Sequence, residues 1–311
     1  MIFVDGQRIE PTAFPDGTSS LRFQPRFGTN LASFMFAYKP EYNIRWLYDN
    51  DAECMQLMYI VKHLKGIGEC RIVLEMPYIP NARMDRVKNT DEVFTLKWFA
   101  DFINSMGFAS VKVLDPHSNV SPALFDRVEM MDVKRYIDRA IHCAKGDKQD
   151  FLLCYPDEGA AKRYSDMLGM EYVFCIKHRD WRTGKIENTE LTSPEKVKGR
   201  DVLIVDDICS RGGTFTYTAK ALKEAGAGNI TLYVTHCENA IHNGSVLTDG
   251  LISHVFTTDS ILRVSHEKIT VMSTDVLNFA KSISKEEDEC DHICISCEQR
   301  AICNGSTYTP E

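Results

Sequence analysis

The amino-acid sequence predicts an α/β protein in which two domains each contain a parallel β-sheet flanked by helices. Three observations support this fold class. The chain has 311 residues, enough for two domains of ordinary size. Hydrophobic residues make up 44% of it, which excludes low-complexity and disordered classes. Short apolar runs alternate with amphipathic stretches, as in chains whose parallel strands are connected by helices.

The alternation predicts the main strands and helices in two series. In the first, a strand, a helix and a strand are expected at residues 71–79, 92–107 and 110–115. In the second, strands are expected at 150–157, 172–178, 201–207 and 229–236, with helices at 158–169 and 214–226.

Three other stretches interrupt this pattern. Residues 128–150 are charged and helix-like without a strand signal, so a domain boundary is expected there. Residues 180–200 are polar and without periodicity, which predicts a mobile loop between two strands. Residues 284–311 begin with an acidic run and end in a cysteine cluster, which predicts an appended tail.

The charge balance argues against a polymeric anion as partner. The net charge is −8 and the pI is about 5.6, so unspecific attraction to nucleic acid or to an anionic membrane is not expected. No run approaches the roughly 18 apolar residues of a membrane helix, and Asp5 stands where a signal peptide carries basic and apolar residues. Seven of the 11 cysteines stand singly, which is typical of free thiols. We therefore expect a cytoplasmic protein.

The segment 201–214, DVLIVDDICSRGGT, carries the strongest functional signal. An apolar strand runs into two adjacent acids, then a small-residue turn, then a helix whose positive dipole end points at the turn. Such a turn can bind a monophosphate, and the acids can accept hydrogen bonds from sugar hydroxyls. The alternative is an ordinary strand-to-helix turn capped by acids. The candidate sugar-phosphate residues are Asp206, Asp207, Ser210, Arg211, Gly212, Gly213 and Thr214.

This segment resembles the phosphoribosyl-diphosphate loop of type I phosphoribosyltransferases and of ribose-phosphate diphosphokinases. Residues 77–86 (PYIPNARMDR), the following stretch to DPHS at 115–118, and PALFD at 122–126 resemble the ATP-binding part of the diphosphokinases, which simple transferases lack. The similarity runs from about residue 14 to 280 and implies two stacked phosphoribosyltransferase-like domains. An ATP-binding domain at 1–133 and a sugar-phosphate domain at 134–283 are expected, followed by the cysteine-rich tail at 284–311.

The resemblance also implies a reaction. Members transfer the β,γ-diphosphate of Mg·ATP to the 1-hydroxyl of ribose 5-phosphate, giving PRPP and AMP, and they form homo-oligomers, here a dimer or a hexamer. Divergent, phage-type members with shortened N-termini in some cases use ADP-ribose as acceptor instead, in NAD salvage. Two further alternatives stay open, a phosphoribosyltransferase that consumes PRPP and a catalytically inactive regulatory subunit.

Site residues follow from the family pattern. Arg83 and Asp85 of ARMDR match nucleotide contacts, and His117 with Asp157 matches a magnesium-associated pair, for which an imidazole and a carboxylate are a plausible partial shell. His117 could instead be an ordinary partly buried histidine, and Asp157 a strand-end cap. His117 also counts among the expected ATP contacts.

The remaining matches concern two charged residues and an aromatic element. Lys177 and Arg179 resemble a basic catalytic pair that would stabilise the charge on the transferring diphosphoryl group, unless they belong to a solvated loop. Phe14 and Asp16 of AFPDGT resemble an element that reaches the adenine of a neighbouring subunit's ATP. Departures from the pattern are Thr18 for Glu, Met84 for Gln, and Ser210 and Arg211 before the glycines.

Four cysteines crowd the C-terminal tail. Cys290, Cys294, Cys297 and Cys303, with His292 among them, have a spacing that Zn²⁺ or an iron–sulfur cluster could use. The first three match the C-x3-C-x2-C of radical-SAM enzymes, but no barrel follows, so that interpretation is discarded. Free cysteines are the alternative. A metal there would have a structural or regulatory role.

Overall fold

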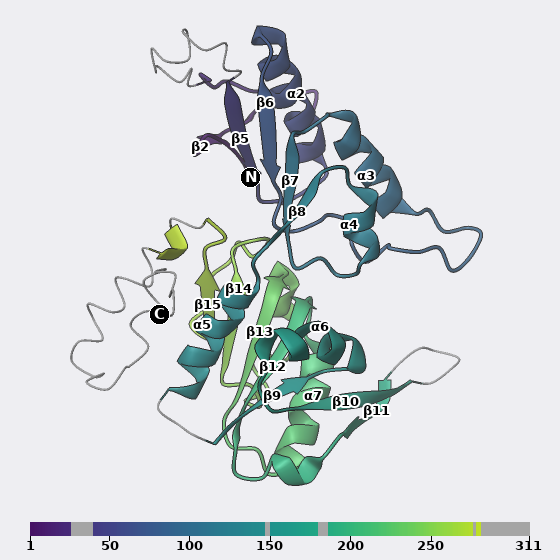
Figure 1. Cartoon of the computed structure of the whole chain (residues 1–311), viewed down its shortest axis with the longest axis vertical. Helices are drawn as coiled ribbons and strands as arrows, with labels where there is room; N and C mark the ends of the chain where they lie inside the picture. Colours follow the sequence, from purple (N-terminus) through teal and green to yellow (C-terminus); the bar gives the residue numbers. More distant parts are fainter. Residues whose placement is uncertain (26–39, 147–149, 180–185, 276–277, 281–311) are drawn as a thin grey trace, which may run out of the picture. The chain divides into compact units, whose positions relative to one another are not determined.

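The computed structural model describes residues 1–25, 40–146, 150–179, 186–275 and 278–280, with side chains left out at 177–179 and 186–188. Two large β-sheets with their helices make up this part of the chain (Figure 1). The expected α/β class is confirmed.

The first sheet has six strands in the order β2-β1-β5-β6-β7-β8. Strands β5 to β8 are parallel, and β1 pairs antiparallel with β5 and with β2. These strands are β1 (Ile2–Val4), β2 (Gln7–Ile9), β5 (Glu41–Trp46), β6 (Arg71–Glu75), β7 (Ser110–Leu114) and β8 (Val128–Met131). The helices between them are α2 (Ala52–Ile67), α3 (Thr95–Ser105) and α4 (Val120–Leu124). A separate hairpin joins β3 (Thr12–Ala13) to β4 (Ser19–Ser20).

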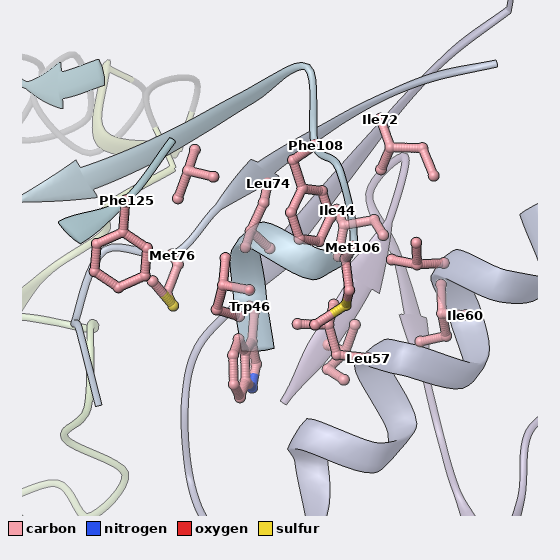
Figure 2. Close-up of a cluster of buried hydrophobic side chains, with 14 of the residues drawn as sticks. Ile44, Trp46, Leu57, Ile60, Ile72, Leu74, Met76, Met106, Phe108 and Phe125 are labelled. Atoms are coloured by element: carbon pink, nitrogen blue, oxygen red, sulfur yellow. The ribbon is translucent and has the colours of Figure 1, made fainter. Parts of the chain in front are cut away.

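The core of the first sheet explains why short apolar runs become strands here. Figure 2 shows Ile44 and Trp46 of β5 beside Leu74 of β6 and Leu57 of α2, and all four side chains are buried. Burying such side chains stabilises the fold by about 1.5 to 3 kcal/mol each relative to exposure. The Trp46 indole N–H donates to the Glu53 carboxylate at 2.9 Å, which satisfies the polar end of a buried ring.

The second sheet has seven strands in the order β11-β10-β9-β12-β13-β14-β15. Strands β10, β9, β12, β13 and β14 are parallel, and β11 pairs antiparallel with β10. These strands are β9 (Phe151–Tyr155), β10 (Tyr172–Arg179), β11 (Ile186–Leu191), β12 (Asp201–Cys209), β13 (Ile230–Cys237), β14 (His254–Thr258) and β15 (Ile269–Met272). The helices are α5 (Lys134–Lys145), α6 (Glu158–Leu168) and α7 (Gly213–Glu224), with short 3-10 turns at Pro194–Lys196 and Asn239–Asn243.

The central strands of the second sheet are buried along their length. Every residue of β9 and of β13 is buried, as expected for parallel strands covered on both faces. Helix α5 packs against β12, β13 and β14, and α6 packs against β9, β10 and β12. This arrangement places the loops that follow β9 and β12 at one edge of the sheet, where open α/β sheets bind their ligands.

The strands and helices predicted from the two series are confirmed, with ends that differ by a few residues. Two expectations were wrong. Residues 128–131, within the stretch expected to lack strand signal, form β8 at the edge of the first sheet. Residues 186–191, within the expected mobile loop, form β11, which pairs with β10. Both strands lie at sheet edges, where one side of the strand needs no apolar neighbour.

No helix in the described ranges is long and apolar enough to cross a membrane. Before Phe14, the chain forms the β1–β2 hairpin.

Candidate active site

A cavity of about 660 Å³ collects most of the residues that the sequence singled out. It lies where the chain leaves β9 and β12. The predicted residues that line it are Arg83, His117, Asp157, Asp206, Asp207, Ser210, Arg211, Gly212, Gly213 and Thr214. A somewhat larger hollow of about 730 Å³ lies near Tyr59 and His63, but its described lining holds no carboxylate and none of the predicted residues. The smaller cavity is therefore the candidate site.

The phosphate loop is shaped by its glycines and by the segment that packs behind it. Gly212 has φ +80° and precedes α7, and a Cβ there would overlap the Val246 side chain. A Cβ on Gly244 would overlap the carbonyl oxygen of Arg211. The backbone at Gly212 therefore adopts a conformation that side chains rarely allow. Gly212 and the first residues of α7, whose N–H groups have no partner within the helix, line the cavity. This arrangement can bind a phosphate.

The two acids at the end of β12 have different surroundings. Asp207 is 4% exposed, and its Oδ2 accepts from His117 Nδ1 at 2.7 Å and from Arg163 Nη1 at 2.9 Å. Burial alone would raise the pKa of Asp207, but these two partners outweigh burial and hold that pKa well below its usual value. Burial, together with the charges of Asp207 and Asp157, raises the pKa of Asp206 well above its usual value. Both acids line the cavity, and Asp206 is the less buried of the two.

Asp157 has a local structural role in addition to its place in the cavity. It is the N-cap of α6, and its side chain accepts from the Ala160 N–H at 3.0 Å. It also lies close enough to Asp206 to raise the pKa of that carboxyl. The strand-end cap that the sequence left open as an alternative is therefore present, and it places the carboxylate at the cavity wall.

The cavity fits a cation that arrives with a ligand better than a resident metal. Within the described part of the chain, no group of three or more His, Cys, Asp or Glu side chains is arranged to hold an ion. Asp157 and Asp206 nevertheless put two repelling carboxylates on one wall. Mg²⁺ commonly binds through one or two carboxylates plus phosphates and water, so this donor set fits it. The four cysteines at 290, 294, 297 and 303 lie outside the described residues.

Arg163 is a cavity residue that sequence reasoning missed, because nothing in the local pattern distinguishes it from its neighbour Lys162. It projects from α6, with a side chain 31% exposed, and donates to Asp207 and to the backbone carbonyl of His117.

A buried polar cluster lies behind the cavity and was also missed. Asp115, 5% exposed, accepts from the Tyr164 hydroxyl at 2.7 Å and from the Thr235 hydroxyl. Burial raises the pKa of Asp115 to about 6, although these two hydrogen bonds oppose the shift. The His236 ring contacts the backbone carbonyls of Leu114 and Asp115, at 3.0 and 3.2 Å. Burial lowers the pKa of His236 to about 4, so this ring is neutral at neutral pH.

The predicted nucleotide residues are only partly brought to the cavity. Arg83 lines it and forms an ion pair with Glu238, with Nη1 and Oε1 2.7 Å apart. Asp85 is buried and accepts from Arg86 at 2.7 and 3.0 Å, and this partner lowers the pKa of Asp85 to about 2. Asp85 therefore supports the 77–86 segment and does not line the cavity.

The remaining predicted residues lie away from this cavity or have side chains outside the described part of the chain. Phe14 is 50% exposed, and Asp16 accepts from the N–H and the hydroxyl of Thr18, at 2.9 and 2.7 Å, in the turn between β3 and β4. Lys177 and Arg179 lie at the end of β10, with their side chains outside the described part.

The fold and the cavity together define a class. A parallel sheet whose central strand ends in two acids, a glycine turn and a helix is the arrangement of a phosphoribosyltransferase-type protein. A model of the phosphoribosyl transferase domain matches residues 125–258.

Comparison with known proteins narrows the class. The chain is 29% identical over 273 residues to a ribose-phosphate pyrophosphokinase of Sulfolobus acidocaldarius, covering 85% of this chain and 88% of that protein. It is 30% identical over 212 residues to one from Vibrio vulnificus, covering 67% and 66%. The phosphoribosylpyrophosphate synthetase structure from Mycobacterium smegmatis superposes with a TM-score of 0.68 at 20% identity, over 90% of this chain and 91% of that one. The chain belongs to the ribose-phosphate pyrophosphokinase family and is an enzyme of the transferase class.

Proposed function

We propose that the protein transfers the β,γ-diphosphate of ATP to the anomeric 1-hydroxyl of ribose 5-phosphate, forming PRPP and AMP. The observation that carries the proposal is that one cavity is lined both by the phosphate loop after β12 and by Arg83 and His117, which follow strands β6 and β7 of the first sheet. A transferase that only consumes PRPP has no need of the segment at 77–86. The PRPP formed in this way would supply nucleotide biosynthesis.

The chain's own residues bind and orient the two substrates in this proposal. The loop N–H groups from Gly212 to Thr214 bind the 5-phosphate, and Asp206 accepts hydrogen bonds from the ribose hydroxyls. Arg83 and His117 face the triphosphate from the other wall. Phosphoryl transfer needs mainly alignment and charge neutralisation, so holding the 1-hydroxyl in line with the β-phosphorus is the main contribution.

Two cationic groups and a metal complete the charge balance. The 1-hydroxyl oxygen forms a bond to the β-phosphorus and loses its proton to water, the bond from that phosphorus to the α-phosphate oxygen breaks, and AMP leaves with the electron pair. Lys177 and Arg179 stabilise the negative charge on the moving group. Mg²⁺ arriving with ATP would be held by Asp157 and Asp206 together with phosphate oxygens and water, and it would neutralise phosphate charge when bound. Zn²⁺ in the tail stays a prediction.

Transfer to ADP-ribose as the acceptor is a second candidate function, because Arg211 lines the cavity next to the phosphate loop. A guanidinium there can pair with a second phosphate beyond the 5-position. The product would then be ADP-ribose 1-diphosphate, as in NAD salvage.

Assembly and compartment complete the proposal. A homo-oligomer would bring the exposed Phe14 and Asp16 of one subunit to the ATP of the next. The buried free thiols of Cys154, Cys209 and Cys237 support the cytoplasm as compartment.

The test is AMP formation by the purified chain with Mg·ATP, offering ribose 5-phosphate and ADP-ribose in parallel. AMP with ribose 5-phosphate supports the first candidate, and AMP mainly with ADP-ribose supports the second. AMP with neither overturns both and favours the inactive regulatory subunit. Release of pyrophosphate from PRPP with a base would instead favour the consuming transferase. Lys177→Ala is expected to lose turnover while keeping ATP binding, measured by calorimetry.

A further inference from the structure

Arg163 connects three groups that come from distant parts of the sequence. Its Nη1 lies 2.9 Å from Asp207 Oδ2 and 3.9 Å from Asp115 Oδ1, and its Nη2 donates to the carbonyl oxygen of His117. Asp207 lies on β12 and the other two lie just after β7 of the first sheet. One guanidinium therefore links the acid at the end of one sheet to the histidine after a strand of the other.

The charges around Arg163 explain why a cation is needed at this point. Asp115 and Asp207 are 5% and 4% exposed, and Asp206, directly before Asp207, lines the cavity. Three carboxyl groups so close would repel one another if ionised without a counter-charge. The guanidinium contacts two of them, and it lies beside the same Asp207 oxygen, Oδ2, that accepts from the His117 ring.

We infer that Arg163 is a positioning residue, which fixes Asp207 and through it the His117 ring in the orientation that the reaction uses. This inference rests on the proposed function, because it assigns a role within the same site. Arg163 acts on the substrates through Asp207 and His117.

Arginine suits this role better than lysine. The two bonds leave the guanidinium from different nitrogens and reach acceptors on two elements, a carboxylate and a backbone carbonyl. A lysine ammonium can supply the charge to Asp207, but as a compact point charge on a flexible stem it does not reproduce the planar fork. Arg163→Lys should therefore recover part of what Arg163→Met loses.

The neighbouring residue supplies a matched control. Lys162 lies on the same helix with a side chain 75% exposed, and it pairs with Glu158 one turn earlier at the surface. Lys162→Ala removes a positive charge from α6 without touching the cavity, and it should leave AMP formation unchanged.

The test is a double-mutant cycle in kcat/KM for AMP formation with Arg163→Met, Asp207→Asn and the double variant. We expect Arg163→Met to lose about 100-fold, with Arg163→Lys in between, because small misplacements of reacting groups have effects of that size. If Arg163 acts through Asp207, the double variant should lose no more than Asp207→Asn alone. Losses that multiply would overturn the inference, because they would mean direct substrate contact or a separate structural effect.

A second measurement needs no turnover and separates this inference from the proposed function. In protein with ¹⁵N-labelled histidine, the ring signals of His117 are assigned by their absence in His117→Gln. Arg163→Met should shift these signals and leave those of His254, which pairs with Thr270, in place. Unshifted His117 signals would overturn the inference. A wild-type chain that makes no AMP would overturn the function alone, and the ring signals would still decide the role of Arg163.

Discussion

The two walls of the candidate active site are held in place by different means. On the wall after β12, a strand, a glycine turn and a helix follow one another within 24 residues, so the chain shapes the phosphate loop locally. On the wall that carries His117, hydrogen bonds come from residues 46, 90 and 122 positions away along the sequence. The wall after β12 can therefore be recognised as a sequence motif. The wall that carries His117 is formed by residues that only the folded chain brings together.

Asp115→Ala should have the largest effect on the wall that carries His117, which is held by long-range hydrogen bonds and is called the long-range wall below. The change removes the acceptor of two buried hydroxyl groups, on Tyr164 and Thr235. Leaving two such groups unpaired should lower the free energy of unfolding by about 3 kcal/mol. Urea unfolding at pH 7 measures this change.

Asp115→Asn is the matched variant, because both hydroxyls donate to the same oxygen, Oδ2, and an amide oxygen in that place can still accept both bonds. It should cost clearly less than Asp115→Ala. Equal stability of the two variants would mean that the hydroxyl partners do not support this wall.

Gly244→Ala should disturb the wall after β12, which the chain shapes locally. Its φ is −105°, an ordinary value, so the effect is steric: the added Cβ overlaps the carbonyl oxygen of Arg211 and must displace the phosphate loop. We expect kcat/KM for the sugar phosphate to fall about 100-fold, because an ångström of misplacement has effects of that size.

Gly66→Ala in α2 is the control, since a Cβ there meets nothing within 4 Å. It should leave activity unchanged. Wild-type kinetics in Gly244→Ala would show that the loop tolerates movement and is not fixed by the segment behind it.

A pH dependence sharpens the description of the long-range wall. Burial lowers the pKa of His236 to about 4, whereas an unfolded histidine has a pKa of about 6.5. The unfolded chain therefore takes up the proton first as pH falls, so the contribution of His236 is complete above pH 6.5 and is lost toward pH 4. Between pH 7 and pH 5 this one group should remove about 2 kcal/mol from the free energy of unfolding.

His236→Asn isolates this contribution from those of the other histidines. The variant should be less stable at pH 7, but its stability should fall less steeply between pH 7 and pH 5. Parallel pH profiles of the two proteins, measured by urea unfolding, would show that another group is responsible.

The contrast between the walls also explains what the sequence could predict. Asp206 to Thr214 are contiguous and follow a long apolar strand, so composition and order alone pointed to them. Arg163, Asp115 and His236 have no such local signature. Their significance comes from the carboxylate, carbonyl and hydroxyl groups that folding brings to them.

The two missed strands have a related physical cause. β8 and β11 each end the order of their sheet. IENTEL is largely polar, and VEMM is only four residues long with no buried side chain, so neither has the long apolar run that marked the central strands. An edge strand pairs on one side only and can keep polar side chains, so hydrophobic pattern is a weak guide to it.

The ion pair between Arg83 and Glu238 is a long-range contact that should contribute little to the free energy of unfolding. The two residues are 155 positions apart, as distant as those of the buried wall, but their side chains are 45% and 27% exposed. Glu238→Gln should therefore change the free energy of unfolding by less than about 1 kcal/mol, because water already screens the pair. Glu158→Gln, which breaks the exposed pair with Lys162, is the control and should have a similarly small effect. The KM for ATP should fall a few-fold in Glu238→Gln alone, since Arg83 no longer has to leave a partner to meet phosphate. A large loss of stability in Glu238→Gln would mean that sequence distance, and not burial, decides how much a long-range contact contributes to stability.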